Sequence, residues 1–242
     1  MRYYALTDTG KSRTENQDYV YASGDSVGIL PNIFIVADGM GGHNAGDYAS
    51  RIAVTTALEQ IKRSDESKPV AILNEAIKKA NYVLYREAQG DIAKKGMGTT
   101  FVAATISDKK LYVANVGDSR LYIASGSSIC QITRDHSLVQ EMLRSGRMGS
   151  FDPKRHPKRN AITRAIGAEE DVTIDFFEVA NNNFEQFLLC SDGLTNMIDD
   201  NEIFAQLTGN DDAKTKASVL VSLANRNGGL DNISAIVVEP FE

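Results

Sequence analysis

Cysteine and tryptophan are scarce in this chain of 242 residues. There is no tryptophan, and the two cysteines, Cys130 and Cys190, lie far apart. They form no Cys-x-x-Cys pair, so neither a zinc ribbon nor a dithiol redox motif is indicated, and we expect no disulfide framework. We interpret both cysteines as small hydrophobic residues at or near strands.

Long apolar segments are also absent. No apolar run approaches the roughly 18 residues of a membrane-spanning helix. The segment from Met1 to Asp8 contains no apolar core of a signal peptide. We therefore expect no membrane insertion and a cytoplasmic location.

Positive charge is in deficit, with 26 Lys and Arg against 32 Asp and Glu and a net charge of -6. Binding to a nucleic-acid backbone needs a cationic surface, so we expect no nucleic-acid partner. If this acidic protein handles phosphate, it needs a local source of positive charge. That source could be bound metal ions or an arginine placed at the site.

The remaining composition is that of an ordinary globular protein. Hydrophobic residues make up 42% of the chain and charged residues 24%, and a chain of this length can bury a sizeable core. No linker, repeat or low-complexity segment interrupts it. We predict a single domain over residues 1–242, present as a monomer.

Short runs of β-branched and aromatic residues predict strands, and apolar residues at helical spacing predict helices. The predicted strands cover residues 3–7, 18–22, 33–37, 99–106, 111–116, 120–124, 172–178, 187–190 and 233–238. The predicted helices cover residues 45–62, 70–88, 138–144, 201–207 and 213–225. Short connections between strands favour antiparallel pairing, and strand groups that alternate with helix pairs indicate an α+β layered domain.

One segment, residues 146–167, shows no clear periodicity and is rich in basic residues. A loop of about twenty residues inside a compact domain is usually functional or disordered. The alternative is a solvent-exposed surface loop without a function, since runs of charged residues are common in loops. Its basic residues are Arg147, Arg155, His156, Lys158, Arg159 and Arg164.

Aspartates follow or precede several predicted strands. Asp38 ends an apolar strand and is followed by Gly39-Met40-Gly41-Gly42, and Asp192 ends another and is followed by Gly193. Asp231 precedes the last strand, and Asp118 lies in a short connection. Taken singly, each aspartate can be explained as a turn residue or a helix cap. Together they supply the oxygen ligands that Mg2+ and Mn2+ prefer.

Arg13 lies after the first predicted strand, in Ser12-Arg13-Thr14-Glu15-Asn16-Gln17-Asp18. Alone it is a surface residue or a structural ion pair. Beside a metal site, its planar and permanently charged guanidinium would bind an anionic substrate.

The motifs resemble, in order and spacing, those of protein phosphatase 2C, the metal-dependent protein phosphatases, and are similar to the compact bacterial members. The resemblance runs from about residue 2 to residue 238. The motifs are Arg13-x-x-Asn16-Gln17-Asp18, Asp38-Gly39-Met40-Gly41-Gly42, Gly98-Thr99-Thr100, Val116-Gly117-Asp118-Ser119-Arg120, Thr163-Arg164-Ala165-Ile166-Gly167, Ser191-Asp192-Gly193-Leu194 and Asp231-Asn232-Ile233-Ser234.

This resemblance implies a four-layer α-β-β-α sandwich, in which helix pairs flank two central, mostly antiparallel sheets, and a site with two Mn2+ or Mg2+ ions. Asp38 would bridge the ions, with Asp192 and Asp231 completing the first, and the Gly39 carbonyl would bind the second. Asp18 would act near the second ion through water.

A third ion is also implied, with Asp118 and Asp192 as its ligands. Residues 146–167 would form the variable flap beside the site. The implied substrates are phosphoserine and phosphothreonine in proteins, and the implied counterpart is a Ser/Thr protein kinase of the same bacterium.

Two departures from the family pattern affect which residue roles apply to this chain. Gln17 stands where many members have glutamate, so the second ion would bind more weakly. Met40 stands where eukaryotic members have a histidine proposed as general acid, and the nearest histidine is His43. His43 is a candidate proton donor, although a histidine that opens a helix is often structural.

The expected chemistry is direct attack on phosphorus by a metal-bridging hydroxide, with Arg13 on the phosphoryl oxygens. A cysteine nucleophile is not expected, because His136 and Asn196 occupy the arginine position of a Cys-x5-Arg signature. Two alternatives stay open: a binding module without turnover, and a hydrolase of small phosphoesters or nucleotides.

Overall fold

The structure is a computed structural model that describes residues 1–42, 45–147, 156–158, 160–180 and 184–240. Two antiparallel sheets form its centre. One has the order β1-β11-β10-β7-β8 and the other the order β2-β3-β5-β6-β9, with β4 paired to β3. The strands are β1 Arg2–Asp8, β2 Asp18–Ser23, β3 Ile33–Met40, β4 Gly98–Thr99, β5 Phe101–Ser107, β6 Lys110–Val116, β7 Arg120–Ser125, β8 Ser128–Gln131, β9 Asp175–Ala180, β10 Gln186–Cys190 and β11 Ile233–Glu239.

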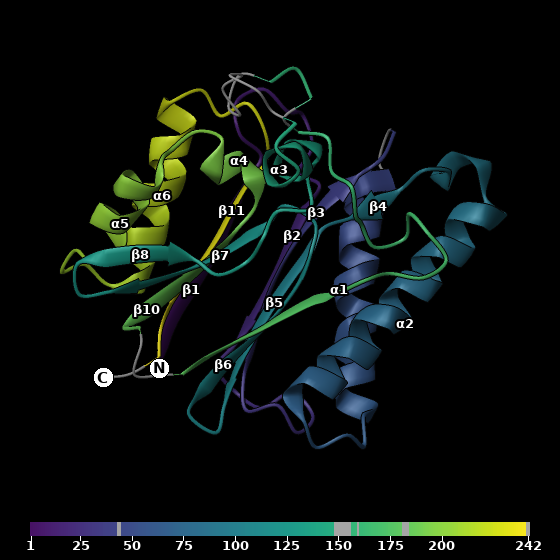
Figure 1. The fold of residues 1–242 in the computed structure, drawn as a ribbon, viewed down its shortest axis with the longest axis horizontal. Helices are drawn as coiled ribbons and strands as arrows, with labels where there is room; N and C mark the ends of the chain where they lie inside the picture. Colours follow the sequence, from purple (N-terminus) through teal and green to yellow (C-terminus); the bar gives the residue numbers. More distant parts are fainter. Residues whose placement is uncertain (43–44, 148–155, 159, 181–183, 241–242) are drawn as a thin grey trace.

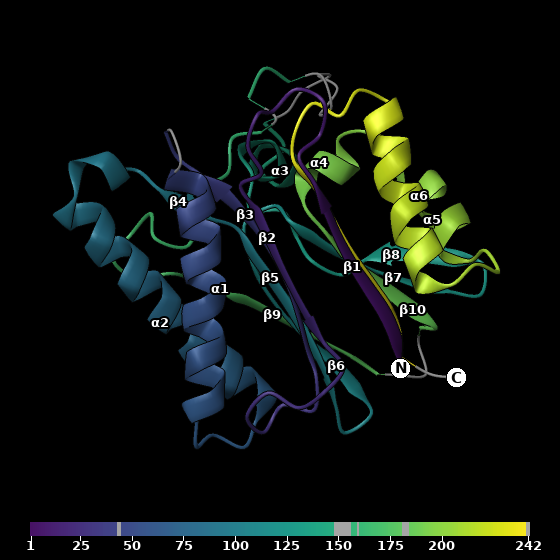
Figure 2. The ribbon, with the colours of Figure 1, turned by 180° about the vertical axis from the view of Figure 1, so that it is seen from behind.

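Helices cover the outer face of each sheet (Figures 1 and 2). The long helices α1 (Ala45–Arg63) and α2 (Pro69–Gly90) lie on the β2-β3-β5-β6-β9 sheet, and α5 (Asp200–Leu207) and α6 (Ala213–Arg226) lie on the other. The short elements are η1 (Ile92–Lys94), α3 (Leu138–Arg144) and α4 (Asp192–Thr195). The predicted four-layer α-β-β-α sandwich is confirmed.

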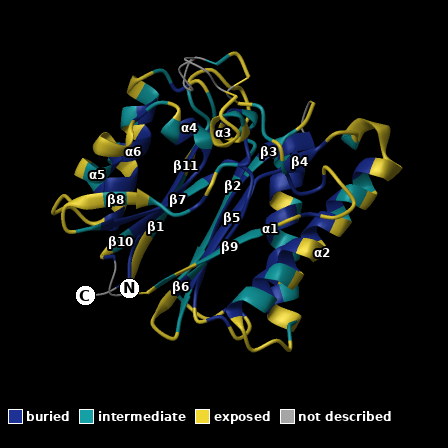
Figure 3. Ribbon diagram, in the orientation of Figure 1, coloured by how far each residue is buried: buried dark blue, intermediate teal, exposed yellow. Residues whose placement is uncertain are grey.

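Strand β3 shows how the layers are built from a period-two pattern. Ile33 and Ile35 pack into the core under α1 and α2, whereas Phe34 and Val36 face the core between the sheets. Because both faces are buried, the strand is apolar throughout rather than alternating. Figure 3 shows buried residues along the centre of both sheets. The buried part of β3 leads directly to Asp38, and Asp231 lies just before β11.

Four strand predictions differ from the structure. The predicted strand at 33–37 extends to Met40, so Asp38 lies within β3 and not after it. The predicted strand at 99–106 is divided at Thr100 into β4 and β5, and the one at 172–178 begins only at Asp175. Val172 is apolar because it packs into the core under α1 and α2 from a loop. The short edge strand β8 was not predicted, and neither were α4 and η1. The predicted helices agree with α1, α2, α3, α5 and α6 to within two residues at each end.

The basic segment 146–167 is described only in part, and residues 148–155 and 159 lie outside the described residues. Its end is held by short β-bridges between Ser137 and Ile162 and between Thr99 and Ile166. Among the described residues, no helix is long and apolar enough to cross a membrane.

Candidate metal centre

The predicted aspartates meet at one end of the sandwich because the strands that carry them are neighbours. Asp18 and Asp38 stand directly opposite each other in the β2–β3 pair. Asp192 follows β10, and Asp231 lies before β11, which pairs with β10. Asp118 lies in the connection from β6 to β7. Residues far apart in sequence thus bring five carboxyl groups to one place.

Four of these carboxyl groups line a cavity of about 250 Å³. Asp18 does not line it and lies buried behind. The lining residues are Arg13, Gln17, Asp38, Gly39, Met40, Gly41, Thr100, Asp118, Asn160, Ile162, Asp192, Asp231 and Asn232.

Asp38 is fixed by a threonine on the neighbouring segment. Its backbone N–H donates to Thr100 Oγ1 at 2.9 Å, and its carbonyl accepts from Thr100 N–H at 2.9 Å. The Thr100 hydroxyl also contacts the hydroxyl of Ser119, next to Asp118, at 2.7 Å. These contacts fix the backbone from which the Asp38 carboxyl group projects.

Asp18 is held by two hydroxyl groups from the opposite sheet. Ser191 and Ser234 both donate to its Oδ2, at 2.8 and 2.7 Å. Within the described part of the chain, its buried Oδ1 has no hydrogen-bond partner. Burying a carboxylate oxygen without a hydrogen-bond donor costs free energy. A water bound to a cation could supply the missing donor.

Crowding and burial raise the pKa values of these carboxyl groups. Burial is the largest cause for Asp38, followed by the charges of Asp18 and Asp192. Burial and the charge of Asp192 raise the pKa of Asp118 to about 8. Burial raises the pKa of Asp18 to about 7, against the lowering effect of its two hydroxyl donors. Burial and Asp231 also raise the pKa of Asp192.

A divalent cation fits this donor set because it removes the repulsion that raises these pKa values. The described residues contain no group of three or more His, Cys, Asp or Glu side chains that is already arranged around a metal position. Mg2+ and Mn2+ usually keep several waters and take few protein ligands, so a sparse carboxylate set is sufficient.

A second pocket of oxygen atoms lies at the start of α1. The Gly39 carbonyl and the Gln17 side-chain oxygen both lie within 3 Å of the position that a Cβ on Gly46 would occupy, at 2.8 and 2.7 Å. A side chain at Gly46 would collide with both oxygens, so the glycine allows α1 to pack closely against them. The Gln17 amide in this place fits the weaker second site predicted from the sequence.

Arg13 extends from the loop between β1 and β2, and its Nη2 donates to Asp231 Oδ2 at 2.9 Å. This contact and the charge of Asp231 raise the pKa of Arg13. The guanidinium therefore brings a permanent positive charge to an otherwise acidic cavity.

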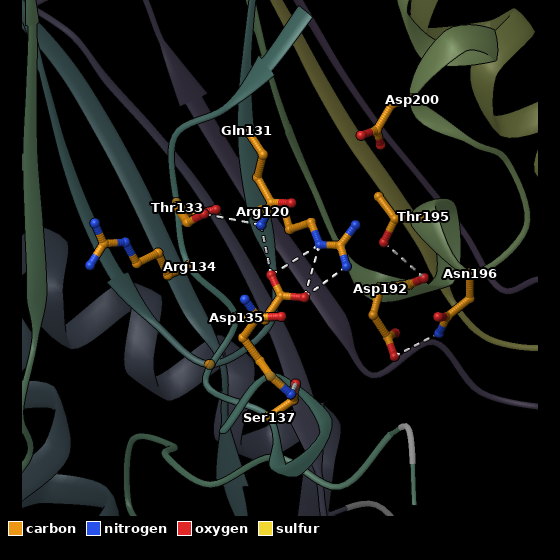
Figure 4. A network of polar contacts seen from close by, with 12 residues as sticks. Arg120, Gln131, Thr133, Arg134, Asp135, Ser137, Asp192, Thr195, Asn196 and Asp200 are labelled. Carbon is orange, nitrogen blue, oxygen red and sulfur yellow. Dashed lines mark hydrogen bonds and ion pairs between the residues drawn. The ribbon is translucent and has the colours of Figure 1, made fainter. Parts of the chain in front are cut away.

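A half-buried arginine network borders the carboxylates (Figure 4). Arg120 forms a bidentate pair with Asp135, with Nη2 to Oδ2 at 2.7 Å and Nε to Oδ1 at 3.0 Å. Beside it, Asn196 Nδ2 donates to Asp192 Oδ2 at 3.0 Å. The charge of Arg120 lowers the pKa values of Asp118 and Asp192, which opposes part of the effect of burial.

The structure brings together Arg13, Asp38, Gly39, Asp118, Asp192 and Asp231, with Asp18 behind them. His43 lies outside the described residues. Thr100, Ser191, Ser234 and Asn232 belong to the sequence motifs, but their roles could not be predicted, because their partners are distant in sequence. His136 is also buried near the site, and its Nδ1 accepts from the N–H of Gly117 at 3.1 Å.

The comparison with known proteins identifies the family. The model of the protein phosphatase 2C family matches residues 9–212. Serine/threonine phosphatase stp of Listeria welshimeri is 41% identical over 246 residues, which cover 96% of this chain and 93% of that protein. The chain belongs to the protein phosphatase 2C family.

Solved structures agree with this protein phosphatase 2C assignment. Serine/threonine phosphatase Stp1 from Staphylococcus aureus has a TM-score of 0.92 at 33% identity, covering 99% of this chain and 95% of that chain. The catalytic domain of serine threonine protein phosphatase PstP, in complex with two manganese ions, has a TM-score of 0.82 at 32% identity and covers 98% of this chain and 96% of that chain. The predicted family and enzyme class, a phosphoprotein phosphatase, are confirmed.

Proposed function

We propose that this protein phosphatase 2C hydrolyses phosphoserine and phosphothreonine in proteins by direct attack of water on phosphorus, with Mn2+ or Mg2+ as its cofactor. One observation carries the proposal: Asp38, Asp118, Asp192 and Asp231 line one cavity together with Arg13. Four carboxylates alone would repel a phosphoryl group. Cations bound to them, together with Arg13, would attract it.

Two ions are proposed, held as the family resemblance implies. Asp38 would be shared between the ions, Asp192 and Asp231 would hold the first with it, and the Gly39 carbonyl would hold the second, with Asp18 nearby. Asp118 and Asp192 are the proposed ligands of a third ion. When bound, such ions make water a nucleophile at neutral pH and offset phosphoryl charge.

The residues of the cavity favour direct hydrolysis over a covalent phosphoenzyme. Cys190 is fully buried, and burial raises the pKa of its thiol to about 12. Among the lining residues that the structure describes, the one hydroxyl belongs to Thr100, which contacts the Asp38 N–H and Ser119. Arg13 is proposed to bind phosphoryl oxygens, and His43 stays a candidate proton donor.

The proposed substrates are proteins phosphorylated by a Ser/Thr protein kinase, because only such an enzyme produces these phosphoesters. The kinase itself is a proposed counterpart and substrate. Phosphoproteomics after loss of this protein would identify the sites whose phosphorylation rises.

Phosphate release from a phosphothreonine peptide tests the proposal. Protein treated with a metal chelator should be inactive, and added Mn2+ or Mg2+ should restore turnover. The same assay with a nucleotide and a small phosphomonoester should give lower kcat/KM values. Lack of turnover at saturating Mn2+ would favour a binding module, and faster turnover of the small substrates would favour a metabolite hydrolase.

A further inference from the structure

One buried side chain anchors both ends of the loop that carries Arg13. Asn232 Nδ2 donates to the carbonyl of Thr9 at 2.9 Å and to that of Glu15 at 2.8 Å. Its Oδ1 accepts from the N–H of Gln17 at 2.8 Å. Asn232 is only 5% exposed, and both amide hydrogens and the amide oxygen are engaged.

The same loop is pressed against the turn before β11. The N–H groups of Lys11 and Ser12 donate to the carbonyl of Gly229 at 2.8 and 3.1 Å. Gly10 has φ +77, and a Cβ there would lie 2.2 Å from the carbonyl oxygen of Asp231. The backbone on either side of Arg13 is therefore closely defined.

The Arg13 side chain has little packing of its own, since 53% of its surface is exposed. Its direction into the cavity consequently depends on its hydrogen bond to Asp231 and on the backbone from which it extends. The three hydrogen bonds of Asn232 bracket that backbone, from Thr9 on one side to Glu15 and Gln17 on the other.

We propose that Asn232 is a positioning residue for the substrate phosphate, which it serves by fixing the loop of Arg13. The proposal rests on the proposed role of Arg13 in binding phosphoryl oxygens. Small displacements of a binding group reduce catalysis strongly, so a loosened loop would weaken substrate binding. Asn232 is not assigned to the metal, because backbone groups already engage its amide.

The residue type is specific to this role. An aspartate has a similar shape, but its carboxylate would face the carbonyl oxygens of Thr9 and Glu15 without a hydrogen to donate. It would also add a negative charge next to Asp231. Only the neutral amide supplies two donors and one acceptor in this geometry.

Asn81 in α2 provides a matched control. It is 2% exposed, accepts from the N–H of Gly167 at 2.8 Å, and donates to the carbonyls of Glu169 and Glu170 at 3.1 and 3.0 Å. It therefore has the same chemistry and burial as Asn232 but anchors a different loop.

The test compares Asn232→Ala, Arg13→Ala, the double variant and Asn81→Ala with a phosphothreonine peptide at saturating Mn2+. Asn232→Ala should raise KM about tenfold with a much smaller change in kcat. The double variant should match Arg13→Ala, because Asn232 acts through that arginine. In the double variant of Asn81→Ala and Arg13→Ala, the effects of the two changes on KM should be independent.

Hydrogen exchange in chelator gives a readout that needs neither metal nor turnover. Amides of residues 9–17 should exchange faster in Asn232→Ala than in wild type or Asn81→Ala. Unchanged exchange there would overturn the proposal, as would a KM effect that persists in full when Arg13 is already removed. A KM that returns to the wild-type value at higher Mn2+ would assign Asn232 to the metal site instead.

Different results would contradict the role of Asn232 and the proposed function. If Arg13→Ala leaves KM unchanged, the proposed role of Arg13 is wrong, and the phosphate-positioning role of Asn232 is overturned with it. Exchange at residues 9–17 would still report whether Asn232 orders the loop. Absence of turnover in the wild type, by contrast, would contradict the proposed function itself.

Discussion

At the scale of single residues, Asp38 and Asp18 pose an electrostatic problem. They stand opposite each other across β2 and β3, where like charges destabilise a sheet. Each can keep a proton, as their raised pKa values indicate, or share a cation. The same contacts that weaken the metal-free protein are therefore those that favour metal binding.

Replacing the central carboxylates should separate stability from activity. We expect Asp38→Asn and Asp192→Asn each to lower kcat/KM by at least about a hundredfold, because a lost ligand weakens the metal site. Both should also raise the melting temperature in chelator, because a buried like charge is removed. Asp118→Ala should be milder and should mainly alter the Mn2+ dependence.

Phosphate release and thermal melting check this prediction, with the exposed Asp65→Asn as control. Full turnover with metal still bound in Asp38→Asn would contradict the ligand assignment. Wild-type behaviour of Asp118→Ala at every Mn2+ concentration would remove the third ion from the mechanism.

The amide of Gln17 offers a gain-of-affinity test. Its side-chain oxygen lies beside the Gly39 carbonyl at Gly46. We expect Gln17→Glu to tighten the weaker Mn2+ site severalfold, because a carboxylate binds a hard cation better than a neutral amide. Isothermal titration calorimetry measures this, and equal affinities in the two proteins would place the second ion elsewhere.

At the scale of elements, local patterns predicted most strands and helices but not their interruptions. The break at Thr100 arises because its hydroxyl, rather than its carbonyl, accepts the N–H of Asp38. No local propensity reveals such a partner 62 residues away. Edge strand β8 is short and partly polar, and it is recognisable only once β7 is beside it.

The candidate site could be predicted only as far as motifs and strand ends reach. Asp38, Asp192 and Asp231 are recognisable because each stands beside an apolar run that predicts a strand. The role of Asn232 depends on Thr9 and Glu15, more than two hundred residues away. Such contacts exist only after β1 and β11 have paired.

The Arg120–Asp135 pair joins β7 to the segment before α3, and its loss should be costly. Asp135→Asn would leave Arg120 without a carboxylate in a site where the two side chains are 26% and 13% exposed. We expect the free energy of unfolding to fall by about 2–4 kcal/mol. Glu178→Gln, in an exposed pair with Lys110, should cost much less, because solvent screens a surface ion pair.

Urea denaturation at neutral pH compares the two variants. The ratio of their effects is the informative quantity, since both changes remove one carboxylate from an ion pair. Equal losses of stability would show that the Arg120 pair is as solvated as the surface pair.

At the scale of the whole molecule, the sandwich concentrates unfavourable like charge at one end, whereas the buried charges of Lys216 and Glu239 elsewhere are paired. Chain segments from both sheets must come together there for the fold to form. Folding is thereby linked to protons and to cations, since either one relieves the repulsion among these carboxyl groups.

The metal-free protein should consequently lose stability as pH rises from about 5 to 8. Asp18 and Asp118 have folded pKa values of about 7 and 8, above the ordinary value of 3.8. In this range the folded state holds more protons than the unfolded state. The free energy of unfolding therefore falls as pH rises, by about 1.4 kcal/mol per pH unit for each retained proton. Bound Mn2+ keeps the carboxylates ionised and should remove most of the slope, so its stabilising effect should grow with pH.

Thermal melting in chelator and in saturating Mn2+ at several pH values measures both trends. The double variant Asp18→Asn, Asp118→Asn provides the control, because amides do not titrate and the slope in chelator should flatten. A metal-free melting temperature that is constant or rises between pH 5 and 8 would show that these carboxyl groups are ionised in the folded protein. In that case hydration or local rearrangement, rather than retained protons, would relieve their repulsion.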